Sequence, residues 1–450
     1  MDQPHVLLFV CDQMQYQRQN IVDPVAFTPN LNRLADEGVF FTHYHCANGQ
    51  CVPSRASMQT GLYPHEAEVM IIYGFHGHTA HITGDQSTMG HVFRDAGYAT
   101  AYFGKTHFGT PLGELGYDIG GKGRKTARPL SVGDGEIVQT AIDFLEGYDP
   151  DTPLFLTVSV NMPHPPFELV ERWADRYPID RIELPKSFYE DDLSDKPQFL
   201  QDHIRDGQHG ALDEEDLRNE TRQYYTMVSE VDRLLGEVRT AFERKGMWDH
   251  TVAAFVSDHG DMMGAHRMRK KGTIPYDEIF RIPFVLKLPG NAHSGSTIDA
   301  LGVNVSLPGT LIGAAGMEVP ASFKGGSMMP IVRGDEEGPD HVFFEHYGAY
   351  WGIHPFRAIR TREWKYVRYY GDDSTEELYH LLEDPNEITN LAGKSDHSDL
   401  QQQLRGRVDR WWDETNGKSA AYYASETFKT RGGDLEALKA VDDTDRGRRE

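Results

Sequence analysis

Three runs of consecutive apolar residues constrain the fold of this chain more than any other feature. They cover residues 5–10 (H-V-L-L-F-V), 154–160 (L-F-L-T-V-S-V) and 251–256 (T-V-A-A-F-V). Runs of this kind are typical of parallel strands that are buried on both faces. Between these runs, residues 99–103 have a further strand pattern. Helical patterns cover residues 31–37, 92–96, 137–145 and 214–245. The alternation predicts an α/β fold with a doubly wound, mostly parallel sheet.

The pattern changes near residue 340. Residues 341–346, 356–361 and 364–370 are expected to form short neighbouring strands, followed by a helix near 400–412. This order predicts a smaller antiparallel α+β subdomain. After Asn416 the chain is polar and charged, and we expect an extended tail. The predicted division is therefore an α/β domain at 1–340, a C-terminal subdomain at 341–416 and a tail at 417–450.

The composition is that of a soluble enzyme, with 39% hydrophobic and 25% charged residues in a chain of 450. Its formal net charge of −24 disfavours nucleic acid or an anionic membrane as a partner, because most of the surface would repel either. No apolar run reaches membrane-spanning length, and residues 1–10 do not have the pattern of a signal peptide. The three cysteines form no paired framework. We expect a cytoplasmic protein, unless a signal peptide was trimmed from the sequence.

Polar side chains follow two of the apolar strands. Asp12 and Gln13 come after the first strand, and Asp258 and His259 come after the strand at 251–256. Ligands of open α/β sheets bind at the carboxyl ends of the strands, so these four side chains are expected to meet. Two carboxylates, an amide oxygen and an imidazole suit one divalent cation, and the oxygen-rich set favours calcium, magnesium or manganese. Taken singly, each residue is also an ordinary turn former.

The run C-V-P-S-R-A-S-M-Q-T-G at 51–61 carries the most chemistry. Pro53 suits the first turn of a helix, which places Cys51 just before a helix N-terminus, where free N–H groups and the helix dipole favour an anion. Arg55 adds a permanent cation one turn further on. The arrangement indicates an activated cysteine beside an oxyanion pocket. The alternative is a structural cysteine that caps the helix.

The ordered motifs resemble those of type I sulfatases, a formylglycine-dependent family of the alkaline phosphatase superfamily. Besides the run at 51–61, they are G-L-Y-P-H (61–65), Y-F-G-K-T-H-F-G (102–109), N-M-P-H-P-P (161–166), S-D-H-G-D-M-M-G-A-H (257–266) and K-K-G-T-I-P-Y-D-E-I-F-R-I-P (270–283). The segments at 357–366 and 377–391 look like the C-terminal subdomain of that family. The resemblance implies an alkaline-phosphatase-like fold and hydrolysis of a sulfate ester.

The resemblance also implies roles for individual residues. A separate maturation enzyme would oxidise Cys51 to formylglycine, whose hydrated form would attack sulfur. Asp12, Gln13, Asp258 and His259, together with residue 51, would hold one cation, Ca²⁺ first and Mn²⁺ or Mg²⁺ next. Arg55 would steady the diol, and Lys105 and Lys271 would neutralise the non-bridging oxygens. His107 would bind or deprotonate the diol, and His164 would assist the leaving oxygen.

Two positions depart from the commonest sulfatase pattern. Many sulfatases have a second aspartate where this chain has Gln13, and an asparagine where it has His259. The combination here looks closer to choline sulfatases and phosphonate monoester hydrolases. A phosphonate monoester or phosphodiester hydrolase is therefore the alternative function, and an anion-binding homologue with an unmodified Cys51 is a third. The sequence leaves open which ester is cleaved, a sulfated saccharide included, and the oligomeric state, a homo-oligomer included.

Overall fold

The computed structural model describes residues 3–121, 129–205, 213–349, 352–371, 375–436 and 438. A mixed sheet of eight strands forms its centre, in the order β4-β3-β5-β1-β6-β7-β2-β8. All neighbouring pairs are parallel except those of β7, which runs antiparallel to β6 and β2. The strands are β1 (His5–Asp12), β2 (Val39–His45), β3 (Ala99–Gly104), β4 (Ile119–Gly121), β5 (Leu154–Pro163), β6 (Thr251–Ser257), β7 (Phe284–Lys287) and β8 (Ser296–Val303).

Strand β1 explains why the sheet needs helices on both faces. Its side chains alternate between two hydrophobic clusters, with Val6, Leu8 and Val10 in one and Leu7 and Phe9 in the other. Every residue of the strand is buried. Burial of apolar side chains on both faces is what the continuous apolar run predicts, and the doubly wound, mostly parallel sheet is confirmed.

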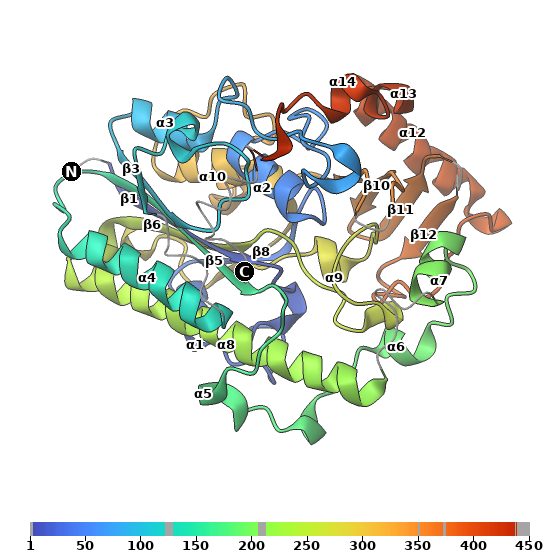
Figure 1. The fold of residues 1–450 in the computed structure, drawn as a ribbon, viewed down its shortest axis with the longest axis horizontal. Helices are drawn as coiled ribbons and strands as arrows, with labels where there is room; N and C mark the ends of the chain where they lie inside the picture. The colour runs from blue at the N-terminus through green and yellow to red at the C-terminus, as the bar shows by residue number, and fades with distance from the viewer. Residues whose placement is uncertain are drawn as a thin grey trace.

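Helices cover both faces of the sheet (Figure 1). Helices α4 (Leu130–Glu146) and α8 (Glu214–Arg244) lie side by side across one face, with α1 (Pro29–Asp36) packed on α8. On the other face α10 (Leu307–Ala314) contacts both α2 (Cys51–Thr60) and α3 (Met89–Asp95). Shorter helices are α5 (Glu171–Ala174), α6 (Lys186–Glu190), α7 (Gln198–Arg205), α9 (Asp277–Phe280) and α11 (Met329–Val332).

A second, smaller sheet lies beside the first (Figure 1). It is antiparallel, in the order β12-β11-β10-β9. Its strands are β9 (His341–His346), β10 (Phe356–Thr361), β11 (Trp364–Tyr369) and β12 (Glu376–His380), and helix α12 (Ser398–Glu414) packs on it. The antiparallel α+β unit is thus confirmed, with β12 as a strand that the sequence did not indicate.

The segment after Asn416 is not extended where the structure describes it. It forms two short helices, α13 (Ala420–Tyr423) and α14 (Glu426–Lys429), whose Tyr423 and Phe428 are buried against the smaller sheet. The N-cap residues of the two helices are Ser419 and Ser425. The side chain of each serine accepts a hydrogen bond from the backbone N–H three residues further on. The division at 340 and 416 stays a prediction. Within the described residues, no helix is both long enough and apolar enough to cross a membrane.

Candidate active site

Four adjacent strands carry the candidate site at their carboxyl ends. In the sheet order β3-β5-β1-β6, the strands are followed or ended by Lys105, His164, Asp12 and Asp258 respectively. Strands β1 and β6 are in register, with Cys11 opposite Ser257, so Asp12 and Asp258 come next to each other. The backbone of the parallel sheet therefore brings together residues that lie far apart in the sequence.

Cys51 approaches this edge from helix α2. The helix begins at Cys51 itself, whereas Cys51 was expected just before the helix, and Gln50 is the N-cap residue with an extended backbone. Every residue of α2 is buried, so the position of the cysteine is fixed by packing. As expected, the thiol lies at a helix N-terminus, where free N–H groups favour negative charge.

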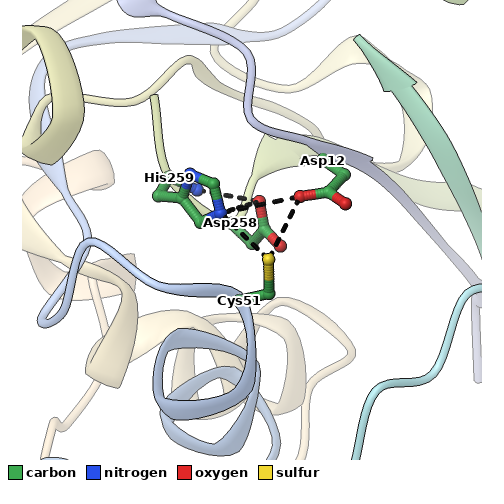
Figure 2. A group of neighbouring side chains, drawn as sticks. All are labelled: Asp12, Cys51, Asp258 and His259. Atoms are coloured by element: carbon green, nitrogen blue, oxygen red, sulfur yellow. Dashed lines mark hydrogen bonds and ion pairs between the residues drawn. The ribbon is translucent and has the colours of Figure 1, made fainter. Parts of the chain in front are cut away.

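The thiol lies at the centre of the site. Figure 2 shows Asp12, Asp258 and His259 pointing toward Sγ of Cys51. Sγ lies 3.6 Å from Oδ1 of Asp12 and 3.3 Å from Nε2 of His259. One ligand atom from each of these four residues lies within 4.8 Å of the others, and all four residues are buried.

Gln13 adds an amide oxygen to this set. Its Oε1 accepts a hydrogen bond of 2.6 Å from Nζ of Lys271, and the same Nζ lies 3.0 Å from Nε2 of His259. The backbone N–H of Gln13 donates to Oδ1 of Asp258 at 3.0 Å. Gln13 has a positive φ of 74°, which turns the chain sharply after β1. Two carboxylates, an imidazole and an amide oxygen in one buried group fit a hard divalent cation.

The protonation state of His259 suits a ligand. Burial and the charge of Lys271, opposed by Asp258, together lower the pKa of His259 to about 3. The imidazole is therefore neutral at neutral pH. Nδ1 lies 2.8 Å from the carbonyl oxygen of Gly260, so it carries the proton and donates it there, leaving the lone pair of Nε2 directed toward Cys51. Ligating histidines commonly have this arrangement.

Arg55 is a buried anchor for the carboxylate of Asp258. Its Nε donates to Oδ2 of Asp258 at 2.7 Å, and Nη1 donates to the carbonyl of Lys105 and to Oγ of Ser159 at 3.1 and 2.9 Å. Burial alone would raise the pKa of Asp258, but His259, Arg55 and the two lysines hold it well below its ordinary value. Nη2 of Arg55 is buried without a hydrogen-bond partner among the described residues.

Two lysines border the thiol. Nζ of Lys271 lies 2.8 Å from Sγ of Cys51, and Nζ of Lys105 lies 3.7 Å from it. Lys105 also forms an ion pair with Oδ2 of Asp12. Both lysines are buried, with exposed fractions of 5% for Lys105 and 7% for Lys271, so their charges act in a poorly solvated environment. The site can thus hold an anion with several negative oxygens next to residue 51.

The two candidate histidines lie on loops at the same edge. Burial lowers the pKa of His164 well below its ordinary value, and the charges of Lys271 and Lys105 add to the shift. Nδ1 of His164 lies 2.5 Å from the carbonyl oxygen of Pro165. His107 is buried, two residues after Lys105, and its ring lies edge-on to that of Tyr73 at 5.6 Å. Their catalytic roles remain predictions.

Several residues that support the site were not predicted from the sequence. Asp261 contacts the amide of Gln13, and Ser159 contacts Arg55. Asp134, on α4, accepts hydrogen bonds from the backbone N–H groups of Asn161 and Met162, at the end of β5 just before His164. The D-H-G-D motif contains Asp261 and was itself a signal, whereas the contacts of Asp134 and Ser159 arise only in the folded chain.

Comparison with known families decides the assignment. The model of the family described as "Sulfatase" matches residues 4–317, which is more than half of the chain. The chain belongs to the sulfatase family. A second model, "N-sulphoglucosamine sulphohydrolase, C-terminal", matches residues 264–414 of this sulfatase. The chain is accordingly an enzyme, a sulfuric ester hydrolase, and the fold and the expected family are both confirmed.

Individual relatives of this sulfatase are distant. An N-acetylglucosamine-6-O-sulfatase of Bacteroides thetaiotaomicron is 25% identical over 463 aligned positions, covering 84% of this chain and 80% of that protein. A structure solved with D-glucosamine-2-N,6-O-disulfate is 21% identical, with a TM-score of 0.79, and covers 93% of this chain and 99% of that one. The phosphonate monoester hydrolase of Agrobacterium radiobacter is 22% identical, also with a TM-score of 0.79, and covers 92% and 96%. At these identities the structural likeness establishes the fold.

Proposed function

We propose that this sulfatase cleaves sulfate monoesters with residue 51 in its formylglycine form and with one divalent cation beside it. The observation that carries the proposal is the position of Sγ of Cys51, which lies at a helix N-terminus, within reach of both lysine ammonium groups and within the group of Asp12, Asp258 and His259. The gem-diol of formylglycine supplies a nucleophilic oxygen and a second hydroxyl whose deprotonation re-forms the aldehyde and releases sulfate. A cysteine or serine ester has no such second hydroxyl.

Asp12, Gln13, Asp258 and His259 would hold the cation, which would polarise the sulfuryl oxygens when bound. The oxygen-rich donor set favours Ca²⁺, with Mn²⁺ or Mg²⁺ as the next candidates. We assign the neutralisation of the non-bridging oxygens to Lys105 and Lys271, because both ammonium groups lie beside residue 51.

The other side chains would handle protons and orientation. Nη2 of Arg55 has no hydrogen-bond partner in the described part of the chain, which supports a role in steadying the diol. His164 would stabilise or protonate the leaving oxygen, and His107 would bind or deprotonate the diol. These assignments rest on motif positions together with the convergence of the strand ends.

A second function is favoured by a specific feature. The pair of Gln13 and His259 in the donor set suggests activity toward phosphonate monoesters or phosphodiesters, and the fold is shared with a phosphonate monoester hydrolase. The experiment that tests the assignment is a comparison of three nitrophenyl esters on one preparation: the sulfate, the phenylphosphonate and the phosphodiester. The proposal predicts the highest kcat/KM with the sulfate. A higher value with either phosphorus ester would support the alternative.

The remaining partners are also proposals. Maturation of Cys51 requires a separate formylglycine-generating enzyme, and the substrate class is a small-molecule or saccharide sulfate ester. Sulfated saccharides are favoured because the relatives include an N-acetylglucosamine-6-O-sulfatase. The cytoplasmic location and a homo-oligomeric state stay predictions.

A further inference from the structure

Asp261 is a buried carboxylate next to the candidate cation site, but the roles assigned above leave it without a function. It lies three residues after Asp258, and its side chain is fully buried. Its Oδ2 accepts a hydrogen bond of 2.5 Å from Nε2 of Gln13. A fully buried carboxylate is costly unless its interactions compensate for the lost solvation, so each of its contacts carries information.

The chemistry of the two neighbours leaves the Gln13 amide one orientation. A carboxylate only accepts hydrogen bonds, and a lysine ammonium only donates them. The amide of Gln13 lies between the carboxylate of Asp261 and the ammonium of Lys271, at 2.5 and 2.6 Å. Its NH₂ group must therefore face Asp261, and its Oε1 must face Lys271.

The second oxygen of Asp261 serves the loop that carries Lys271. Oδ1 accepts the backbone N–H groups of Met263 and Lys270 at 2.8 and 3.0 Å. The backbone carbonyl of Asp261 accepts a further hydrogen bond from the side chain of Gln15. One carboxylate thus connects the turn after β1 with the residue that precedes Lys271.

We propose that Asp261 is a positioning residue that fixes the Gln13 amide with its oxygen toward the divalent cation. The inference rests on the proposed function, because it takes Gln13 as a cation ligand. Partners of metal ligands commonly contribute a factor of about 10 to 100 to metal affinity. Asp261 would have this effect without touching the cation or the substrate.

Asp261→Asn tests the proposal with almost no change in shape. The single carbonyl oxygen of asparagine is required by the N–H groups of Met263 and Lys270, so its NH₂ group would face Gln13. The amide of Gln13 would then turn and present NH₂ to the cation. We expect the affinity for Ca²⁺ and for Mn²⁺ to fall by about tenfold or more, measured by calorimetric titration of the chelator-treated full chain.

Repeating the substitution in a Gln13→Asp chain distinguishes a positioning role of Asp261 from a general structural role. In a Gln13→Asp chain there is no amide to turn, so adding Asp261→Asn should not weaken cation binding further. Asp232→Asn is the matched control, because Asp232 is a buried carboxylate that accepts the backbone N–H groups of Asn30 and Leu31 away from the site. It should leave cation affinity unchanged.

Each outcome decides between the explanations. Wild-type affinity in the Asp261→Asn chain would overturn the proposal. An equal loss in the Gln13→Asp background, or an equal loss in Asp232→Asn, would also overturn it by showing a structural effect. A wild-type chain that binds neither ion would overturn the cation site of the proposed function, and this inference with it. Loss in Asp261→Asn alone, abolished by Gln13→Asp, is the result that the proposal predicts.

Discussion

Nζ of Lys271 lies 2.8 Å from Sγ of Cys51 and 2.6 Å from Oε1 of Gln13. One ammonium group therefore contacts both the residue proposed as nucleophile and a residue proposed as cation ligand. Lys105 pairs with Asp12, and its Nζ lies 3.7 Å from the same sulfur. Negative charge that develops beside residue 51 would be met by two preorganised cations.

Replacement of either lysine should reduce catalysis strongly. We expect Lys105→Ala or Lys271→Ala to lower kcat/KM by about a hundredfold, comparable to the loss of one preorganised oxyanion donor. Steady-state kinetics with nitrophenyl sulfate measures the effect. Lys324→Ala is a suitable control, because Lys324 is exposed and pairs only with Glu66 among the contacts described, so its kcat/KM should stay at the wild-type value. A loss of less than a few fold at both active-site lysines would refute their role.

His164→Ala should show a dependence on the leaving group. A residue that protonates or stabilises the leaving oxygen matters most for alkyl and sugar alcohols and much less for nitrophenol, whose anion is already stable. The test compares kcat/KM of the wild type and the variant on an alkyl sulfate and on nitrophenyl sulfate. Equal losses on both substrates would mean that His164 only shapes the pocket, and His107 would become the candidate for this role.

Removal of the cation should inactivate the enzyme. Exhaustive chelation should remove most activity because the Lewis acid is lost. Asp12→Ala or Asp258→Ala should do the same, because Lys105 or Arg55 would also lose its carboxylate counter-charge. Activity of the chelated wild type should return on addition of Ca²⁺ or Mn²⁺, whereas the variants should not recover. Full activity after chelation, verified by elemental analysis, would show that no cation takes part.

Two buried histidines should contribute a loss of stability as the pH falls from about 7 to about 4. Burial lowers the pKa of His78 to about 4 and that of His346 to about 3, from an ordinary value of 6.5. Below pH 6.5 the unfolded chain gains protons on these residues that the folded chain does not, so the free energy of unfolding falls. Thermal unfolding followed by circular dichroism should give a lower Tm at pH 5 than at pH 7.

His346→Asn provides the control for this pH dependence. The side chain lies next to the hydroxyl of Thr273, at 2.9 Å, and asparagine keeps a polar group there without a titrating ring. We expect the variant to be less stable at pH 7 but to lose less Tm between pH 7 and pH 5 than the wild type. An unchanged slope would exclude His346 as a source of the pH dependence.

In the large sheet, the strands that the sequence predicts are those with a nearly continuous apolar pattern. All eight residues of β1 are buried, and the run of apolar residues that results is recognisable as a strand in the sequence. Strand β8 alternates between half-buried and exposed residues over Ser296–Ala300, and β7 has only four residues, so neither has a run long enough to recognise. The antiparallel direction of β7 depends on its neighbours in the sheet and has no local signature.

The candidate site was predictable to a similar extent. Asp12 and Asp258 follow recognisable strands, and the rule that strand ends meet at one edge was enough to pair them. The hydrogen bond from Gln13 to Asp261 was not predictable, because it depends on the left-handed backbone of Gln13 and on the course of the loop after β6. Motif position identified Lys271, but its contact with the cysteine required the fold.

The most direct test of the proposed mechanism is to measure the chemical state of residue 51. Peptide mass analysis of chains made with increasing amounts of the maturation enzyme gives the fraction in which the Cys51 thiol has become an aldehyde. The formylglycine mechanism predicts that turnover of the sulfate ester rises in proportion to this fraction. It also predicts that Cys51→Ala is inactive but has an unchanged circular dichroism spectrum. Full turnover by a chain whose Cys51 is entirely a thiol would contradict it.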